Sequence, residues 1–287
     1  MQRSDREQAW DAFAPDSLRG RTALVTGGGS GIGRSTARLL AYLGVRVAVV
    51  GRTPEGLAAT AADIAEAAGP AVLAVPCDLR EPEAVDGMLD KVLGEFGGLD
   101  YLVNNAGGQF IAPAESVSIK GFRAVTRLNL DAVWYLTTRV AGRAMIPAKS
   151  GKIVSITMTP RRGMPGMAHS SAARAAVESL TSTLAQEWAP HGIRLAAVAP
   201  GIVLTEGWQA NYGLDPALVG SVIPAGRLQQ PEEVAAVVGF LLSPLGDYIT
   251  GQTLVADGGY ELLGPANALQ AAFAARQPAA PPPIAGA

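Results

Sequence analysis

The sequence predicts a single α/β domain in which a doubly wound parallel sheet carries helices on both faces. Short, almost continuous apolar runs recur along the chain, which is typical of strands buried on both faces of a parallel sheet. Segments with helical periodicity alternate with these runs, as a doubly wound sheet requires. A glycine cluster, "TGGGSGIG" at 26–33, joins the first apolar run to the first helical segment.

The predicted strands and helices alternate in chain order. The apolar runs, rich in Val, Leu, Ile and Ala, lie at 22–27, 45–51, 71–78, 99–107, 151–157, 193–201 and 253–259. The predicted helices cover Gly31–Leu43, Pro54–Ala68, Pro82–Phe96, Lys120–Met145, Ser171–Trp188 and Pro231–Leu242. We see no internal repeat beyond this alternation.

The body of the domain is expected to span residues 18–263. Residues 1–17 form an N-terminal extension without the apolar stretch of a signal peptide, and residues 264–287 form an Ala/Pro-rich tail of the composition typical of disorder. Within the body, residues 205–226 interrupt the strand–helix rhythm with Gly, Pro and the aromatics Trp208 and Tyr212. We expect this segment to form a lid over a substrate.

Composition narrows the class of protein. Of 287 residues, 48% are hydrophobic and 17% are charged, which is enough to build a large core. The net charge of −2 gives no electrostatic reason to expect a nucleic acid or an anionic membrane as partner. No run approaches the roughly 18 apolar residues that span a bilayer. The one cysteine, Cys77, excludes an intramolecular disulfide, so we expect a cytoplasmic protein with a buried thiol and no metal site.

The glycine cluster predicts a dinucleotide site. Glycines at the end of a buried strand allow positive φ angles and let backbone N–H groups approach a pyrophosphate at the start of the following helix. Strand, glycines and helix occur here in the order that such a site requires. A turn without a ligand is the alternative.

The spacing of this cluster resembles the TGxxxGxG motif of the short-chain dehydrogenase/reductase family. Further matches follow in order: "CDL" from Cys77, "NNAG" from Asn104, a helix asparagine at Asn129, "APG" from Ala199 and "ITGQTLVADGG" near the end. The match covers about 20–259. The resemblance implies a seven-stranded Rossmann sheet, a nicotinamide cofactor and a homotetramer.

One branch of that family is more similar than the others. The stretches "NNAGGQFIAPAESVSIKGF", "AHSSAARAAVESLT" and "SPLGDYITGQ" resemble peroxisomal-type trans-2-enoyl-CoA reductases. Bacterial relatives that act on citronellol-like alcohols or branched acyl-CoAs look similar. The 2,4-dienoyl-CoA reductases share the loss of a tyrosine at the expected position.

The resemblance also implies which residues bind the cofactor. Family members that prefer NAD carry an acid at the end of the second strand, where this chain has Gly51 followed by Arg52. Because a guanidinium suits a 2′-phosphate, we expect NADPH rather than NADH. A solvated loop charge is the alternative for Arg52, and a turn role for Asp78. The expected cofactor-binding residues are Gly27, Gly29, Ser30, Gly31, Ile32, Gly33, Arg52, Asp78, Leu79, Asn105, Ala106, Gly107, Arg174, Pro200, Gly201 and Ile202.

The catalytic positions depart from the family's pattern of serine, tyrosine, lysine and helix asparagine. Met158 stands in place of the serine, Ser170 of the tyrosine and Arg174 of the lysine, while Asn129 is retained. A guanidinium, with a pKa above about 12, cannot exchange a proton near neutrality, but it can bind a ribose and supply positive charge.

The missing phenol favours conjugate reduction. Losing a positioned general acid costs about 10²–10⁴-fold, and the loss falls hardest on reactions that protonate an alkoxide. Hydride addition to an enoyl thioester instead builds an enolate, which hydrogen-bond donors stabilise without full proton transfer. The sequence therefore predicts an NADPH-dependent oxidoreductase that reduces a conjugated C=C bond of an enoyl-CoA-like thioester. An alcohol dehydrogenase or ketoreductase with a rewired proton path, and a non-redox or pseudoenzyme member, are the alternatives.

The candidate hydrogen-bond donors are Ser170, Thr157 and His169, with Tyr212 as a possible acid from the lid. Ser170 could instead cap a helix that begins at Ser171. His169 could be a hydrogen-bonded structural residue, and Tyr212 could pack the lid. For Glu178 we expect a surface pair with Arg174, four residues earlier.

Overall fold

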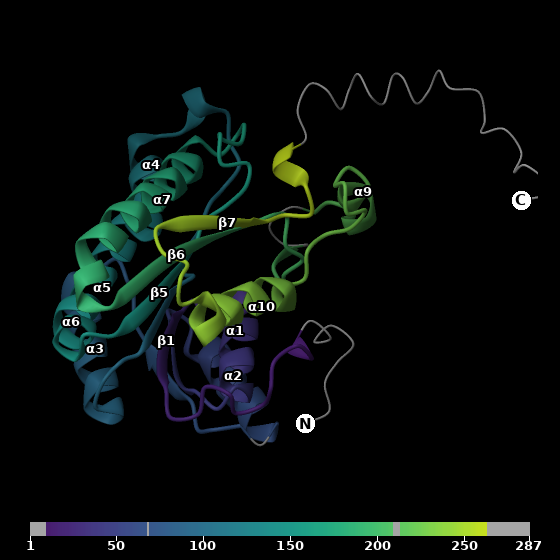
Figure 1. The fold of residues 1–287 in the computed structure, drawn as a ribbon. Coiled ribbons are helices and arrows are strands. Elements are labelled where there is room, and N and C mark those ends of the chain that lie inside the picture. The colour runs from purple at the N-terminus through teal and green to yellow at the C-terminus, as the bar shows by residue number, and fades with distance from the viewer. Residues whose placement is uncertain (1–9, 68, 209–212, 263–287) are drawn as a thin grey trace, which may run out of the picture.

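The computed structural model describes residues 10–67, 69–208 and 213–262. Its centre is a sheet of seven parallel strands in the order β3-β2-β1-β4-β5-β6-β7, which confirms the predicted fold class (Figure 1). The strands are β1 (Thr22–Thr26), β2 (Arg46–Gly51), β3 (Leu73–Pro76), β4 (Tyr101–Asn104), β5 (Gly151–Ile156), β6 (Ile193–Pro200) and β7 (Gln252–Ala256).

The inner strands are buried on both faces, which explains their uninterrupted apolar sequences. In β1 every residue is buried, and successive side chains point to opposite faces of the sheet. Ala23 and Val25 belong to the hydrophobic core on one face of the sheet, whereas Leu24 belongs to the core on the opposite face. A strand that contributes side chains to two cores has no polar face, so polar and apolar residues do not alternate along it.

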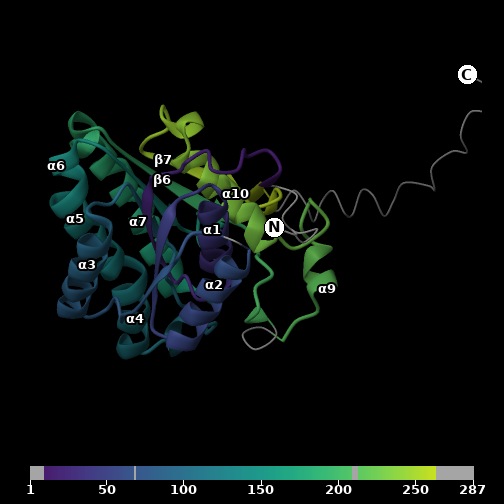
Figure 2. The same ribbon diagram turned by 90° about the horizontal axis from the view of Figure 1, so that it is seen from below.

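Helices cover both faces of the sheet in two layers (Figure 2). One layer is formed by α1 (Gly31–Tyr42), α2 (Pro54–Glu66) and α10 (Pro231–Leu242). The other contains α3 (Pro82–Phe96), α5 (Ala132–Val140) and α7 (Ala168–Trp188).

The helices depart from the sequence-based expectation in places. The single helix expected over Lys120–Met145 consists of three α-helical segments, α4 (Ile119–Thr126), α5 and α6 (Ile146–Ala148). Two π-helical turns, at Arg127–Asp131 and Ala141–Met145, join these segments. A short helix, α9 (Pro216–Gly220), and 3₁₀ turns at 114–116, 189–191, 244–246 and 260–262 were not predicted. Helix α7 begins at Ala168, so Ser170 lies inside its first turn. The cap role considered for Ser170 is therefore wrong.

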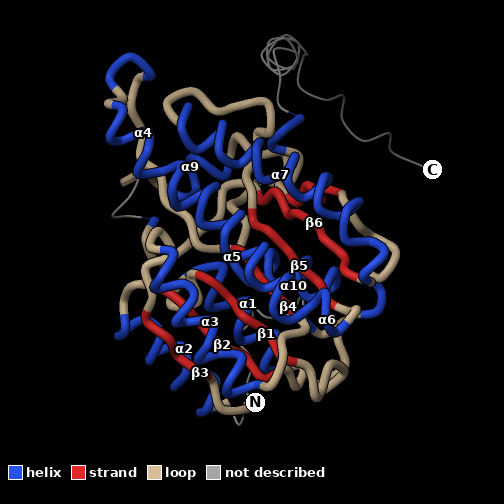
Figure 3. Tube along the Cα trace, turned by 90° about the vertical axis from the view of Figure 1, so that its left-hand side faces the viewer, coloured by secondary structure: helices blue, strands red, loops and turns tan. Residues whose placement is uncertain are grey.

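The strand order places a ligand site at the carboxyl ends of β1 and β4. Strand β1 pairs with β2 on one side and with β4 on the other. Strands β2 and β3 therefore extend the sheet to one side of β1, and β4 to β7 extend it to the other. The order of the strands from β3 to β6 can be followed in Figure 3. Connections diverge at this switch point, and ligands of open α/β sheets bind in the crevice that results.

Candidate functional site

The turn between β1 and α1 requires glycine for steric reasons. Gly27 and Gly31 have φ angles of +64° and +50°, a region that other residues rarely adopt. A Cβ atom on Gly33 would lie 2.2 Å from the Gly27 carbonyl oxygen, and one on Gly27 would lie 2.8 Å from Nδ2 of Asn105. The chain therefore packs strand, turn and helix at a distance that only glycine permits, as a close approach to a pyrophosphate demands.

A cleft of about 360 Å³ runs beside this turn and gathers many of the residues predicted to bind the cofactor. Other predicted residues are absent from its lining: Gly31, Ile32 and Gly33 lie in the first turn of α1, and Pro200–Ile202 lie at the end of β6 and just beyond it. Asn105 holds the two strand ends together, because its Nδ2 donates to the Thr26 carbonyl at 2.9 Å. The cleft is lined by Gly27, Gly29, Ser30, Gly51, Arg52, Thr53, Gly56, Leu57, Cys77, Asp78, Leu79, Ala106, Gly107 and Leu128. Its shape and its glycine cradle fit a dinucleotide.

The charges at the far end of the cleft suit a phosphate. Arg80 donates from Nε to Oδ1 of Asp78 at 2.9 Å, and this contact lowers the pKa of Asp78 to about 2. The Asp78 carboxylate is thereby compensated, while Arg52 lies exposed on the cleft wall without an ion pair to any described carboxylate. Arg80 was not predicted, although its position two residues after Asp78 was a local signal for it.

Asn129 and Ser170 form one buried cluster. Asn129 lies in the π-helical turn and is held from both ends, since its Oδ1 accepts from the Gly108 backbone N–H and its Nδ2 donates to the Gly108 carbonyl, both at 3.0 Å. The same Nδ2 lies 3.5 Å from Oγ of Ser170, and Ser170 donates to Oε1 of Gln109 at 2.9 Å. Gln109 was missed by sequence reasoning, although it directly follows "NNAGG". The sulfur of Met158 lies 3.7 Å from the Ser170 hydroxyl and completes the cluster.

Arg174 places a buried positive charge beside this cluster. Its Nη1 donates to the Ile156 carbonyl at 2.7 Å, and its Nη2 lies so close to Gly107 that a Cβ there would be 2.0 Å away. Burial lowers the pKa of Arg174 to about 10, so the group stays protonated at neutral pH. Within the described part of the chain no carboxylate pairs with it. A desolvated cation without an anionic partner is costly, and a polar or anionic ligand at this point would offset that cost.

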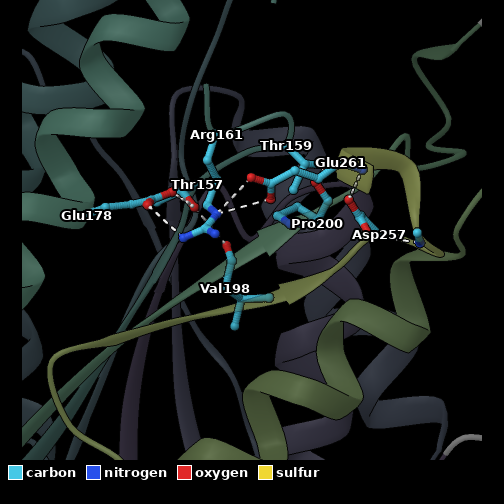
Figure 4. Close-up of polar contacts among 9 residues, drawn as sticks. Thr157, Thr159, Arg161, Glu178, Val198, Pro200, Asp257 and Glu261 are labelled. Atoms are coloured by element: carbon cyan, nitrogen blue, oxygen red, sulfur yellow. Dashed lines mark hydrogen bonds and ion pairs between the residues drawn. The ribbon is translucent and has the colours of Figure 1, made fainter. Parts of the chain in front are cut away.

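Thr157 and Glu178 belong to a separate network (Figure 4). The Thr157 hydroxyl has two acceptors within reach, Oε1 of Glu178 at 3.2 Å and the Val198 carbonyl at 3.3 Å. Arg161 lies 3.8 Å from Oε2 of Glu178 and 3.1 Å from Oε2 of Glu261. The expected Arg174–Glu178 surface pair is therefore wrong, because Arg174 turns inward and Glu178 pairs with the loop after β5. Partial burial raises the pKa of Glu178.

His169 is fully buried beside Ser170. Its Nδ1 accepts from the Ser170 backbone N–H at 2.7 Å, and its ring meets Phe110 edge-on with the centroids 4.2 Å apart. Its Nε2 has no hydrogen-bond partner among the described residues, and burial lowers the pKa of the imidazole. Tyr212, the acid considered for the lid, lies outside the described residues.

The described ranges show neither a metal-binding cluster nor a membrane-spanning helix. They contain no group of three or more His, Cys, Asp or Glu side chains that could hold a metal ion. They also contain no helix with the length and apolar character needed to cross a membrane. Cys77 is buried as expected, and burial raises the pKa of its thiol to about 11.

Comparisons with known proteins agree with this geometry. The family model described as "Enoyl-(Acyl carrier protein) reductase" matches residues 27–261. The chain is 37% identical over 257 residues to a peroxisomal 2,4-dienoyl-CoA reductase of Pongo abelii, covering 88% of each chain. It is 38% identical to a 3-oxoacyl-[acyl-carrier-protein] reductase of Synechocystis sp., covering 85% of this chain and 98% of that one.

A solved structure is also similar, that of a citronellol catabolism dehydrogenase of Pseudomonas aeruginosa PAO1. It superimposes with a TM-score of 0.78 at 41% identity, over 87% of this chain and 98% of that chain. The relatives thus include reductases of C=C bonds and of carbonyl groups.

Proposed function

The chain belongs to the short-chain dehydrogenase/reductase family and is an oxidoreductase, and from that premise we propose that it uses NADPH to reduce a conjugated C=C bond of an enoyl thioester. The observation that carries the proposal is the pair formed by Ser170 and Arg174. A buried serine hydroxyl stands where a phenolic acid would protonate an alkoxide. A buried guanidinium, with no carboxylate partner among the described residues, lies one helical turn away. Such a site stabilises delocalised negative charge better than it transfers a proton.

Ser170 is suited to hydrogen-bond the thioester oxygen. Its hydroxyl is oriented by Asn129 Nδ2 and now donates to Gln109. A substrate oxygen that replaced Gln109 as acceptor would receive the same hydrogen bond, and one such oriented donor is worth about 10²–10³-fold in rate. No described tyrosine hydrogen-bonds to Ser170, Asn129 or Arg174.

Arg174 is suited to hold the nicotinamide ribose and to supply charge. Its guanidinium is fixed by the Ile156 carbonyl and faces Gly107, on the rim of the cleft. Bound NADPH would supply the hydride that adds to the β-carbon. The proton for the α-carbon would come from water or a nearby side chain other than Arg174, because a guanidinium cannot release one near neutrality.

Arg52 supports NADPH over NADH. It follows Gly51 at the end of β2 and lines the cleft, and the compensated Asp78 nearby leaves the local charge positive. Arginine binds a 2′-phosphate through several hydrogen bonds at once, whereas an NAD site would place an acid here. Replacing Arg52 with alanine is expected to weaken NADPH binding and to leave NADH binding unchanged.

Isotope labelling tests the reaction. Purified protein is incubated with NADPH deuterated at its transferable position and with medium- and long-chain 2-enoyl-CoA, and the product is examined by mass spectrometry and NMR. We expect the label at the β-carbon. Label at a carbinol carbon, obtained with 3-oxoacyl or other carbonyl substrates alone, would indicate the ketoreductase or alcohol dehydrogenase reaction. Failure to consume NADPH with any enoyl-CoA would contradict the proposal.

A further inference from the structure

Glu206 contacts the turn that is expected to bind the cofactor's phosphates. It belongs to the turn 205–208 beyond β6, which is far from α1 in the sequence. Its Oε2 accepts the backbone N–H of Gly31 at 2.8 Å, and its Oε1 lies 3.2 Å from Nη1 of Arg34. The carboxylate thus engages the first residue of α1 and the nearest guanidinium together.

The Glu206 carboxylate lies at the start of α1, where this fold binds the phosphates of a dinucleotide. The first turn of a helix has unpaired N–H groups and a partial positive charge, and the pyrophosphate of a dinucleotide lies at the helix after the first strand. Glu206 therefore occupies a backbone donor at the helix end where a cofactor phosphate is expected. Thr205 adds to the overlap, because a Cβ atom on Gly31 would lie 3.0 Å from Cγ2 of Thr205.

Backbone hydrogen bonds anchor the turn that carries Glu206, whereas the Glu206 side chain is largely exposed to solvent. The Leu204 N–H donates to the Gln229 carbonyl at 2.8 Å, and the Trp208 N–H donates to the Thr205 carbonyl at 3.0 Å. The Trp208 ring is buried in an apolar cluster with Ile223. The Glu206 side chain is 56% exposed, so its carboxylate can rotate into solvent without unfolding the turn.

We propose that Glu206 is an internal competitor of the cofactor: its carboxylate occupies the phosphate position of the glycine turn in the free protein and is displaced when the dinucleotide binds. This inference rests on the proposed use of NADPH. In the free protein Glu206 satisfies the Gly31 N–H and neutralises Arg34. A bound phosphate takes over both partners. Since these contacts must break before the dinucleotide can bind, Glu206 weakens cofactor binding.

Calorimetric titration of the full chain with NADPH tests this. We expect Glu206→Ala to lower the dissociation constant about 3- to 10-fold, the size of one exposed charge-assisted contact, and Glu206→Gln to lower it less. Glu66→Ala, which removes an exposed carboxylate at the end of α2, should leave the constant unchanged. Unchanged or weaker binding by Glu206→Ala would overturn the proposal.

Two further readouts separate this inference from the proposed function. Thermal unfolding should show a lower midpoint for Glu206→Ala than for wild type without ligand, and equal midpoints at saturating NADPH. Titration with inorganic pyrophosphate alone should show tighter binding by Glu206→Ala. A wild-type protein that binds neither NADPH nor NADP⁺ would end the proposed function, yet the pyrophosphate titration would still decide whether Glu206 competes with an anion. Equal pyrophosphate affinities would overturn the competitor role.

Discussion

The two halves of the sheet differ in what their chemistry depends on. The half around β1 and β2 carries the glycine turn of the candidate cofactor cleft, with glycines at the points of closest approach. The half around β4, β5 and α7 forms the candidate catalytic cluster from side chains, and here Met158, Ser170 and Arg174 replace the family's usual groups. A backbone site tolerates little change in sequence, whereas a side-chain site can exchange its chemistry on an unchanged fold. In the proposed function, the protein keeps the glycine turn for a dinucleotide while the side chains beside the substrate differ from the family's usual ones.

The largest effect is expected from Gly33→Ala, which tests the backbone half. The added Cβ would lie 2.2 Å from the Gly27 carbonyl oxygen, and neither backbone segment can move away. We expect overpacking to cost about 1–3 kcal/mol of unfolding free energy and to abolish measurable NADPH binding. Urea unfolding and calorimetry check both effects.

Gly87→Ala is the matched control for this change. Gly87 lies in α3 with no heavy atom within 4 Å of its built Cβ, so alanine should stabilise the protein by up to about 1 kcal/mol through helix propensity. If Gly33→Ala behaved like Gly87→Ala, the steric account of the glycine turn would be wrong.

Arg174→Ala is expected to have the next largest effect. Removing the buried cation would take away the proposed ribose contact and the proposed positive charge at the reacting centre, so cofactor affinity and turnover should fall together, turnover by about 10²-fold. Arg174→Lys keeps the charge and should recover part of both. Steady-state kinetics and NADPH titration measure this, and unchanged cofactor affinity in Arg174→Ala would contradict the assigned role.

Ser170→Ala separates chemistry from binding. We expect turnover to fall by about 10²-fold through loss of one oriented donor, with NADPH affinity unchanged because Ser170 does not line the cleft. Thr183→Ala, on the exposed face of the same helix, should change neither. Full activity of Ser170→Ala would contradict the donor role of Ser170. The buried His169 would then be the next candidate for the donor.

The smallest effect is expected from Asp78→Asn and depends on pH. Arg80 lowers the folded-state pKa of Asp78 to about 2, below the unfolded value of about 3.9. The pair therefore stabilises the fold above pH 4, and its contribution is lost as the pH falls from about 4 to about 2. Because the pair is partly exposed, we expect a difference from wild type of no more than about 1 kcal/mol at pH 7.

That difference should vanish near pH 2 in urea unfolding experiments. A stability gap that persisted there would show that Asp78 acts through something other than its charge.

Much of the fold follows from patterns local to the sequence. Strands buried on both faces must be apolar throughout, so β1, β2 and β5 were visible as short runs, and the glycine cluster located the first strand–helix junction. The π-helical turns within 127–145 were missed, since helical periodicity and propensity do not register a one-residue change in hydrogen bonding. The start of α7 at Ala168 was missed because helix ends are weakly marked in the sequence.

The partners of the site residues were decided by tertiary structure. Sequence spacing suggested that Arg174 would pair with Glu178 one turn away, but packing directs Arg174 to the Ile156 carbonyl and leaves Glu178 to Arg161. The contact between Glu206 and Gly31 joins residues 175 positions apart and has no local signal at all. The sequence alone specified the strands and the glycine turn, because these depend on burial and local steric limits. Side-chain pairing across the sheet is set only when distant segments compete for the same donors and charges.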